Sequence, residues 1–195
     1  MGLVSLAVDP ALGGGFAQNV CDLGDKLTIL DARSDYDLSR TEEQLDLITG
    51  MVKTYRPSLV IIEFDAQQKG LGNDDRMKAL ALLYGFQIRP HITRGVKMDE
   101  VFGVASMDQS FKAGDIRIPY GDQETQDRMS HLIAQLRAWR PDIKTKNLTQ
   151  DAVMALWFNW KHWMSVRKIH EAPPAPAWRP SWVFEERGLR AGRVA

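Results

Sequence analysis

An uninterrupted apolar segment, SLVIIEF at residues 58–64, constrains the fold more than any other part of the chain. Its β-branched residues follow one another without the polar alternation of a strand that has one face in water. The segment therefore predicts a strand buried on both faces, which is typical of a sheet covered by helices on each side. Glu63 is the one charge in this run, and a buried strand needs a reason to contain it.

Three further strands are predicted before this segment, at residues 3–9, 16–22 and 27–33. Turns that contain glycine separate them, so short antiparallel hairpins should join the three strands into a meander. A helix is predicted next, because apolar residues recur at helical spacing until Pro57 ends the pattern. The buried strand would then return to the sheet beside the meander.

The rest of the chain alternates between helices and short extended segments. The predicted elements are a helix at 74–84, a strand at 86–89, and helices at 98–112, 123–139 and 150–167, with a short extended segment at 114–121. From Glu171 onward the sequence is rich in proline, which favours an extended, semi-rigid chain. We therefore expect an α/β domain over residues 1–170, built on a mixed five-stranded sheet flanked by helices, and a proline-rich tail over 171–195.

Single residue types exclude several classes of protein. Cys21 is the only cysteine, so an internal disulfide and a cysteine-based zinc cluster are excluded, and we expect it to be a small buried strand residue. Trp157, Trp160 and Trp163 share the last predicted helix, and we interpret them as core residues rather than as a base-stacking platform. Without a stretch long enough to span a membrane, the chain is expected to be cytoplasmic.

Charge is balanced overall but is unevenly distributed. The formal net charge is zero, which argues against a strongly basic nucleic-acid-binding protein. Residues 1–136 hold 14 Lys and Arg against 20 Asp and Glu, and residues 137–195 hold 11 against 5, so the two parts carry net charges near −6 and +6. The basic last third is compatible with a polyanionic partner, and a solvated surface explains it equally well.

Two acidic residues end predicted strands. Alternation places Asp9 on the same face as Ser5 and Ala7, although a residue before Pro10 also suits a turn. Glu63 lies in the central strand, where glutamate is rare. Unpaired carboxylates in a low dielectric cost several kcal/mol, so a buried acid becomes neutral, pairs with a base or binds a metal. Neither strand supplies a basic partner.

Two further acids could join this pair. Asp65 shares the face of Glu63 and is an alternate or additional ligand if the strand extends that far. Asp151 stands in the first turn of a helix that is apolar on nearly every side, and such a helix should lie against the sheet. Its first turn would bring Asp151 to the rim of the sheet. An acid at this position also complements the helix dipole, which is a sufficient structural explanation by itself.

The order of the predicted elements is typical of the ribonuclease H-like fold. A meander, a helix, a central strand, alternating strands and helices, and a final buried helix occur in that order. In that fold the first and fourth strands are neighbours, and an acid on each meets an acid from the last helix. Asp9, Glu63 and Asp151 stand at the corresponding places in this chain.

Three short motifs also resemble one family, the nuclease domain of the large subunit of tailed-phage terminases. AVDPALGGG resembles its first acidic motif, LVIIEFDAQQKG its second and TQDAVMALWF its third, and residues 91–121 resemble the helix and extended segment between the last two. The resemblance covers roughly residues 3–168. It implies an endonuclease that cuts concatemeric viral DNA and delivers it into the prohead.

The resemblance also implies a site and its ions. Carried over residue by residue, it makes Asp9, Glu63 and Asp151 the ligands of two divalent cations, Mg²⁺ or Mn²⁺, with Asp65 as the less certain ligand. Oxygen ligands without a Cys and His set suit those ions. The ions would lie on either side of the scissile phosphate and activate the attacking water. Three basic residues could contact the DNA backbone, although their place in loops is better explained by simple solvation: Lys69, Arg94 and Lys97.

The partners expected from the resemblance are double-stranded DNA, the terminase ATPase domain, the small subunit and the portal protein, in the cytoplasm of an infected bacterium. The phosphate-binding motif G-x-x-x-x-G-K-[ST] is missing from the sequence, so the ATPase motor is not expected in this chain. A near-zero net charge further implies weak DNA affinity for this domain alone.

Three other interpretations use the same residues. A cellular RuvC-like junction resolvase would share the carboxylates but act as a dimer on branched DNA. An actin-like or sugar-kinase fold also begins with a strand, an aspartate and glycines, but it needs two related halves and a second phosphate loop. A non-catalytic packaging adaptor could dock on the portal through a tail that carries Trp178, Arg179 and Trp182.

Overall fold

The computed structural model describes residues 2–10, 15–35, 38, 40–64, 69–93, 103–140 and 150–171, apart from the side chains of residues 69 and 168–171. Six strands form one sheet within these ranges: β1 (Val4–Asp9), β2 (Phe16–Leu23), β3 (Leu27–Asp35), β4 (Leu59–Glu63), β5 (Gln87–His91) and β6 (Ile116–Arg117). Their order across the sheet is β5-β4-β1-β2-β3-β6.

The pairing of the strands confirms a meander joined to parallel strands. β1, β2 and β3 pair antiparallel in sequence order. β4 pairs parallel to β1, and β5 pairs parallel to β4. β4 is therefore an internal strand, as its continuous apolar sequence predicts, and all five of its residues are buried. The sheet has one strand more than expected, because two residues of the predicted extended segment pair with the free edge of β3 as β6.

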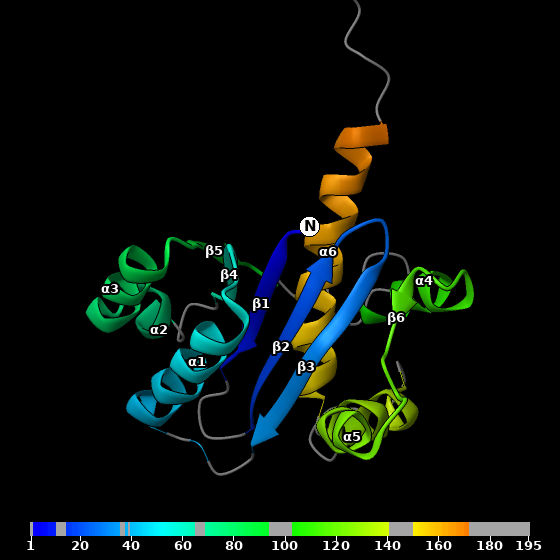
Figure 1. The fold of residues 1–195 in the computed structure, drawn as a ribbon, viewed down its shortest axis with the longest axis horizontal. Coiled ribbons are helices and arrows are strands. Elements are labelled where there is room, and N and C mark those ends of the chain that lie inside the picture. Colours follow the sequence, from blue (N-terminus) through cyan, green and yellow to red (C-terminus); the bar gives the residue numbers. More distant parts are fainter. Residues whose placement is uncertain are drawn as a thin grey trace, which may run out of the picture.

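Helices cover both faces of the sheet. The described helical elements are α1 (Thr41–Tyr55), α2 (Lys69–Asn73), α3 (Asp75–Tyr84), the 3₁₀ turn η2 (Val104–Ser106), α4 (Met107–Lys112), α5 (Gln123–Ala138) and α6 (Asp151–Glu171). In Figure 1, α6 crosses behind the meander, and α1 lies on the opposite face beside β1. The layers are thus helix, sheet and helix.

Alternation along β1 divides the interior into two hydrophobic cores. Ala7 belongs to the core under α4, α5 and α6, whereas Leu6 and Val8 belong to the core under α1 and α3. β4 divides in the same way, since Ile61 faces α6 and Ile62 faces α1. The face predicted to carry Asp9 and Glu63 is therefore the face that α6 covers.

The residues interpreted as core residues are buried. Cys21 is fully enclosed in β2, and Trp157, Trp160 and Trp163 are buried between α6 and the sheet. Two of these indoles also donate hydrogen bonds from Nε1, Trp160 to Ser110 Oγ and Trp163 to the Gly24 carbonyl. The tryptophans therefore fix the helix against the sheet, and the base-stacking interpretation is wrong for this helix.

Element boundaries differ from the sequence prediction mainly in loops. The predicted helix at 98–112 begins outside the described residues, and its described part is split into η2 and α4. α6 continues to Glu171, four residues beyond the predicted end. Residues 172–195 lie outside the described part of the chain, so the division into domain and tail stays a prediction. No helix in the described ranges is long and apolar enough to cross a membrane.

Candidate active site

Two buried carboxylates come side by side where β1 and β4 end. Val8 pairs with Ile62 in parallel register, so the next step along both strands places Asp9 beside Glu63. Both side chains are almost fully enclosed, with exposed fractions of 5% for Asp9 and 2% for Glu63. Two strands that are far apart in the sequence therefore bring a pair of acids to one point on the face that α6 covers.

Neighbours on the chain after β4 hold Glu63 in place. The Thr93 hydroxyl donates a hydrogen bond to Glu63 Oε1, and Thr93 is itself buried. His91 of β5 pairs with Glu63 in the sheet. The imidazole of His91 lies 4.4 Å from the Phe158 ring and 5.3 Å from the Trp157 ring, centroid to centroid. The Thr93 hydroxyl thus holds Glu63, and the neighbouring His91 packs against two aromatic rings of α6.

Asp151 is the first residue of α6, and side chains from α5 and its C-cap contact the residues on either side of it. Gln135 Oε1 accepts a hydrogen bond of 2.9 Å from the Ala152 backbone N–H. Trp139 Nε1 donates to Gln150 Oε1 at 3.0 Å. A helix start has backbone N–H groups without intrahelical acceptors, so Gln135 satisfies one of them from a neighbouring helix. The carboxylate of Asp151 also complements the helix dipole, as predicted.

The predicted ligands are therefore only partly brought together. Asp9 and Glu63 are neighbours, and Asp151 begins the helix that covers their face. Among the side chains that the structure describes, no three His, Cys, Asp or Glu residues lie close enough to hold a metal ion. Three other predicted site residues lie outside the described ranges, as does the side chain of a fourth: Asp65, Arg94, Lys97 and Lys69.

A buried polar network lies between α6 and the sheet, and no motif pointed to it. Ser5 Oγ donates to Asn159 Oδ1 at 2.6 Å, and Asn159 Nδ2 donates to the Asn19 carbonyl at 2.9 Å and to Asn19 Oδ1 at 3.1 Å. The Cys21 thiol donates to the same Asn19 oxygen, and burial raises the pKa of that thiol. The available signal was Asn159 itself, an amide that follows seven consecutive apolar residues.

A basic pair lies farther along α6, on the β5 side. Arg89 Nη1 lies 2.9 Å from His162 Nδ1. Because a guanidinium only donates, Nδ1 must accept, so the neutral ring carries its proton on Nε2. Burial, followed by the charge of Arg89, lowers the pKa of His162. Lys161, one residue earlier, places its ammonium 5.8 Å from the Trp157 ring.

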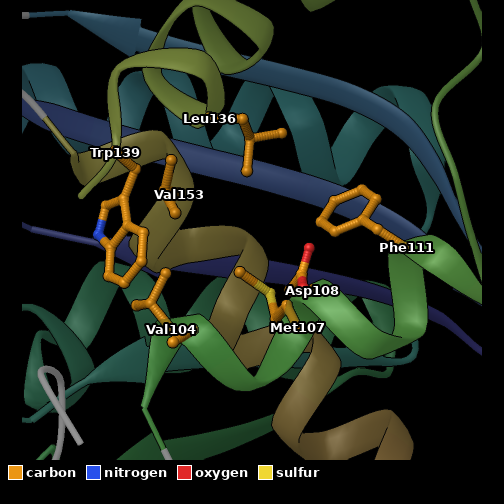
Figure 2. A pocket seen from close by; sticks show the side chains of 8 residues that line it. Val104, Met107, Asp108, Phe111, Leu136, Trp139 and Val153 are labelled. Atoms are coloured by element: carbon orange, nitrogen blue, oxygen red, sulfur yellow. The ribbon is translucent and has the colours of Figure 1, made fainter. Parts of the chain in front are cut away.

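A pocket of about 380 Å³ opens between η2, α4, α5 and the start of α6. Figure 2 shows Trp139 and Val153 on one side of it and Phe111 on the other. Its lining is apolar apart from Asp108 and backbone atoms. A surface of this kind does not suit a hydrated cation or a phosphate.

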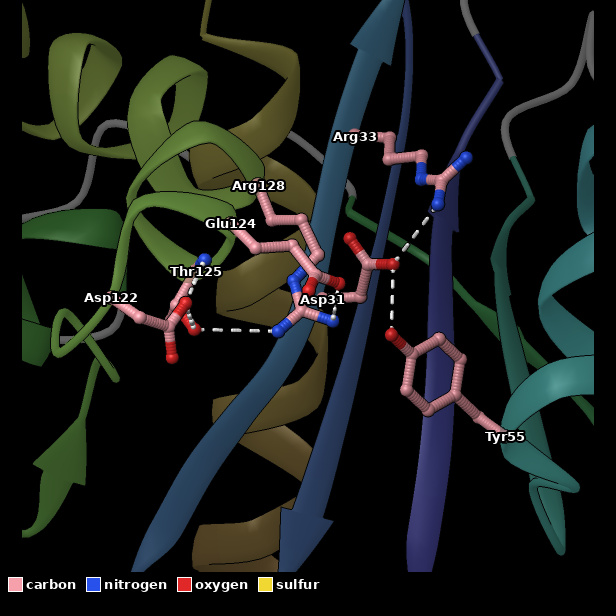
Figure 3. Close-up of polar contacts among 7 residues, drawn as sticks. All are labelled: Asp31, Arg33, Tyr55, Asp122, Glu124, Thr125 and Arg128. Carbon is pink, nitrogen blue, oxygen red and sulfur yellow. Dashed lines mark hydrogen bonds and ion pairs between the residues drawn. The ribbon is translucent and has the colours of Figure 1, made fainter.

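One more buried acid belongs to a separate polar cluster. Asp31 of β3 is fully enclosed, accepts a hydrogen bond of 3.0 Å from the Tyr55 hydroxyl and pairs with Arg33 at 3.3 Å (Figure 3). Burial, then the Asp31 charge, raises the pKa of Tyr55. A neighbouring set on α5 links Arg128 to Thr125 and Glu124. Both contacts of Asp31 are made by its Oδ2 atom, so a base and a hydroxyl lie beside the charge of this acid.

Solved structures with a similar arrangement include two Holliday junction resolvases and a RuvC complex. The yeast mitochondrial Holliday junction resolvase Ydc2 matches with a TM-score of 0.51 and 11% identity, over 85% of this chain and 80% of that one. The fowlpox virus resolvase, in complex with Holliday junction DNA, matches with a TM-score of 0.50 and 9% identity, over 83% of this chain and 99% of that one. The Thermus thermophilus RuvC structure, in complex with a Holliday junction substrate, matches with a TM-score of 0.47 and 16% identity, over 89% of this chain and 99% of that one.

The fold is ribonuclease H-like. No protein-family model matches the sequence, and no curated protein matches it. The ribonuclease H-like architecture was predicted from the order of elements and is confirmed. The yeast and fowlpox virus structures are resolvases rather than terminase nucleases, so the resemblance to terminases stays a prediction that rests on the sequence motifs.

Proposed function

We propose that this protein is a divalent-metal-dependent DNA endonuclease. The observation that supports this most strongly is the adjacent burial of Asp9 and Glu63 on parallel strands, on the face where α6 begins with Asp151. Two enclosed carboxylates of like charge repel each other, and a cation between them would remove that cost. The ribonuclease H-like fold, shared with enzymes that resolve DNA junctions, supports the same interpretation.

The proposed ligands are the carboxylates of Asp9, Glu63 and Asp151, with Asp65 as an alternate or additional one. Their hard oxygen atoms suit two Mg²⁺ or Mn²⁺ ions, which would activate water and stabilise the leaving oxygen of a phosphodiester. The chain's own contribution is orientation: Thr93 holds Glu63, and Gln135 holds the backbone next to Asp151. Lys69, Arg94 and Lys97 remain proposed contacts to the DNA backbone.

A nicking assay tests the proposal. With Mn²⁺ and supercoiled plasmid, the wild-type protein should produce nicked and linear DNA, and Asp9→Asn and Asp151→Asn should each reduce the rate by about 100-fold or more. Asp127→Asn is the matched control, because Asp127 is an exposed acid on α5. A wild-type protein that leaves plasmid intact in Mn²⁺, or two active-site variants that cut normally, would overturn the proposal in favour of a non-catalytic adaptor.

Two substrates follow from two separate observations, and one competition experiment distinguishes them. The three acidic sequence motifs support a terminase nuclease, which cuts linear concatemers without a structural preference. The likeness to resolvase structures supports a four-way junction instead. A labelled junction and a duplex of the same arm sequence, mixed at equal concentration, should be cut at similar rates by a terminase nuclease. Symmetric cleavage of the junction alone would identify a resolvase.

The terminase interpretation carries partners that can be tested separately. An ATPase domain, a small subunit and a portal protein would each have to bind this chain in solution. Binding of a purified portal ring, measured by sedimentation with and without residues 172–195, tests the docking role proposed for the tail. Equal binding by the full and shortened chains would remove that role.

A further inference from the structure

Asn159 interrupts the apolar part of α6 and is completely buried. Its side chain accepts from Ser5 of β1 and donates to Asn19 of β2, so one amide joins the helix to two strands. The orientation of the amide is settled by its partners. The Asn19 carbonyl can only accept, so Nδ2 must point toward it, and Oδ1 is left to receive the Ser5 hydroxyl.

The same contacts show which way α6 runs over the sheet. Asn159 lies at Asn19, and four residues later Trp163 bonds the Gly24 carbonyl, so α6 runs in the direction of β2. β2 is antiparallel to β1, and α6 therefore runs opposite to β1, as Figure 1 shows. Going back along α6 from Asn159 thus leads toward the end of β1, where Asp9 lies.

The separations along the helix and the strands agree. Asp151 precedes Asn159 by eight residues, which is about 12 Å of helix. On β1, Asp9 follows Ser5 by four residues, or about 13 Å, and on β2 the partner of Asp9, Ala17, is two residues or about 7 Å from Asn19. The distance along α6 from Asp151 to Asn159 therefore lies between the two distances along the strands that separate Asp9 from the partners of Asn159. The Asn159 contacts therefore bring the start of α6 level with Asp9.

We propose that Asn159 is a positioning residue that fixes the axial register of α6 and so keeps the start of this helix, with Asp151, level with the Asp9 and Glu63 pair. The role rests on the proposed metal-dependent endonuclease function. Apolar side chains on either side of Asn159 contact the sheet without directional preference, and they do not by themselves select one axial position. A slip by one helical turn would move Asp151 by about 5.4 Å, which is farther than a metal–oxygen bond can span. Buried hydrogen bonds provide the directional selection.

Metal binding and DNA cutting both test this role. Asn159→Leu keeps the branched shape of the side chain but is larger and removes all three hydrogen bonds of the amide, and Ser5→Ala removes one of them from the strand side without adding volume. For both variants we expect a folded protein by circular dichroism, a half-saturating Mn²⁺ concentration raised by about tenfold for Asn159→Leu and less for Ser5→Ala, and slower nicking. The Mn²⁺-induced rise in melting temperature reports binding without activity.

A double-mutant cycle separates positioning from general destabilisation. In the Asp151→Asn background, Asn159→Leu should cause no further loss of Mn²⁺ affinity, because its effect passes through Asp151. Leu156→Ala is the control, since it removes buried volume from the same helix but leaves the three hydrogen bonds in place. It should lower the melting temperature without raising the half-saturating Mn²⁺ concentration.

Three outcomes would overturn the proposal. Unchanged Mn²⁺ affinity in Asn159→Leu and Ser5→Ala would show that register does not depend on these bonds. Equal loss of affinity in Leu156→Ala would make the effect one of stability alone. If Asn159→Leu does not fold, Ser5→Ala with wild-type affinity decides against the role. A different result would remove the endonuclease proposal, and the positioning role with it. In that result, Mn²⁺ does not raise the melting temperature of the wild-type protein, or it raises that of Asp9→Asn by the same amount.

Discussion

Asp31 and Glu63 are both buried carboxylates on strands of one sheet, and their neighbours differ in charge. Asp31 lies beside Arg33 and the Tyr55 hydroxyl, so its charge is compensated within the protein. Glu63 receives a hydroxyl from Thr93 and lies next to Asp9, another acid. Burial therefore does not identify a metal ligand by itself, and the neighbours of each acid have to be compared as well.

Removing one charge from the acid pair should stabilise the metal-free protein. We expect Glu63→Gln to raise the melting temperature in EDTA by a few degrees, because repulsion from Asp9 disappears while an oxygen remains to accept from Thr93. The same variant should reduce the shift caused by Mn²⁺. Glu124→Gln, an exposed acid on α5, is the control in both measurements by differential scanning calorimetry. A lower melting temperature in EDTA would show that Glu63 is compensated within the protein.

His162 should make the stability depend on pH. Its pKa is lowered in the folded state, first by burial and then by Arg89, so the unfolded chain binds the proton more readily. The stabilisation from the neutral ring is present above the unfolded pKa of about 6.5 and is lost as pH falls through the folded value. His162→Asn, whose Oδ1 can accept from Arg89, should flatten the melting temperature between pH 7 and 5. At pH 8 both proteins should melt within a degree or two of each other.

Secondary-structure elements determine where each acid lies. Parallel pairing of β1 with β4 sets Asp9 beside Glu63, and contacts from α5 and the sheet set the start of α6. The sequence predicted the two strands and the apolar helix correctly, because hydrophobic periodicity is a strong local signal. It did not predict Gln135 or Thr93 as supports, because each acts on a residue that is far away in the sequence, and a single sequence carries no record of such pairs.

Loss of the Gln135 cap should weaken the start of α6. Gln135→Ala removes the acceptor for the Ala152 N–H, and we expect a loss of about 1 kcal/mol in the free energy of unfolding. Urea titration followed by tryptophan fluorescence measures it. Gln126→Ala, which changes the same residue type earlier in α5, should cost less than half as much. Equal losses in the two variants would show that the effect is one of α5 itself.

Across the whole molecule, the ribonuclease H-like topology was predictable, and the relative positions of the proposed ligands were not. The order of strands and helices already indicated the topology, since the short connections allow few alternatives. Two parts could not be foreseen. β6 joins β3 although only two residues pair, and the three proposed ligands do not form one cluster among the described residues. The geometry of a metal site depends on side-chain positions to within about an ångström. Sequence patterns predict only the order of the elements and the face of a strand or helix on which each residue lies.

The proposed division into domain and tail makes a prediction for a shortened chain. A protein that ends at residue 171 retains every described element, and its melting temperature should equal that of the full chain within about 2 °C. Nicking of plasmid should also persist. Thermal unfolding of the two purified proteins in the same buffer is the measurement. A drop of more than about 5 °C would show that residues 172–195 belong to the folded unit.

α6 follows all the other described elements in the sequence, and this order has a consequence for synthesis. β1 and β4 leave the ribosome early, whereas Asp151 is made after every strand of the sheet, and α6 then has to dock on residues of β1 and β2. A nascent or prematurely terminated chain therefore holds at most two of the three proposed ligands. On the proposed function, we expect cutting activity to appear only after translation has passed α6, and we expect products that end before α6 not to cut DNA.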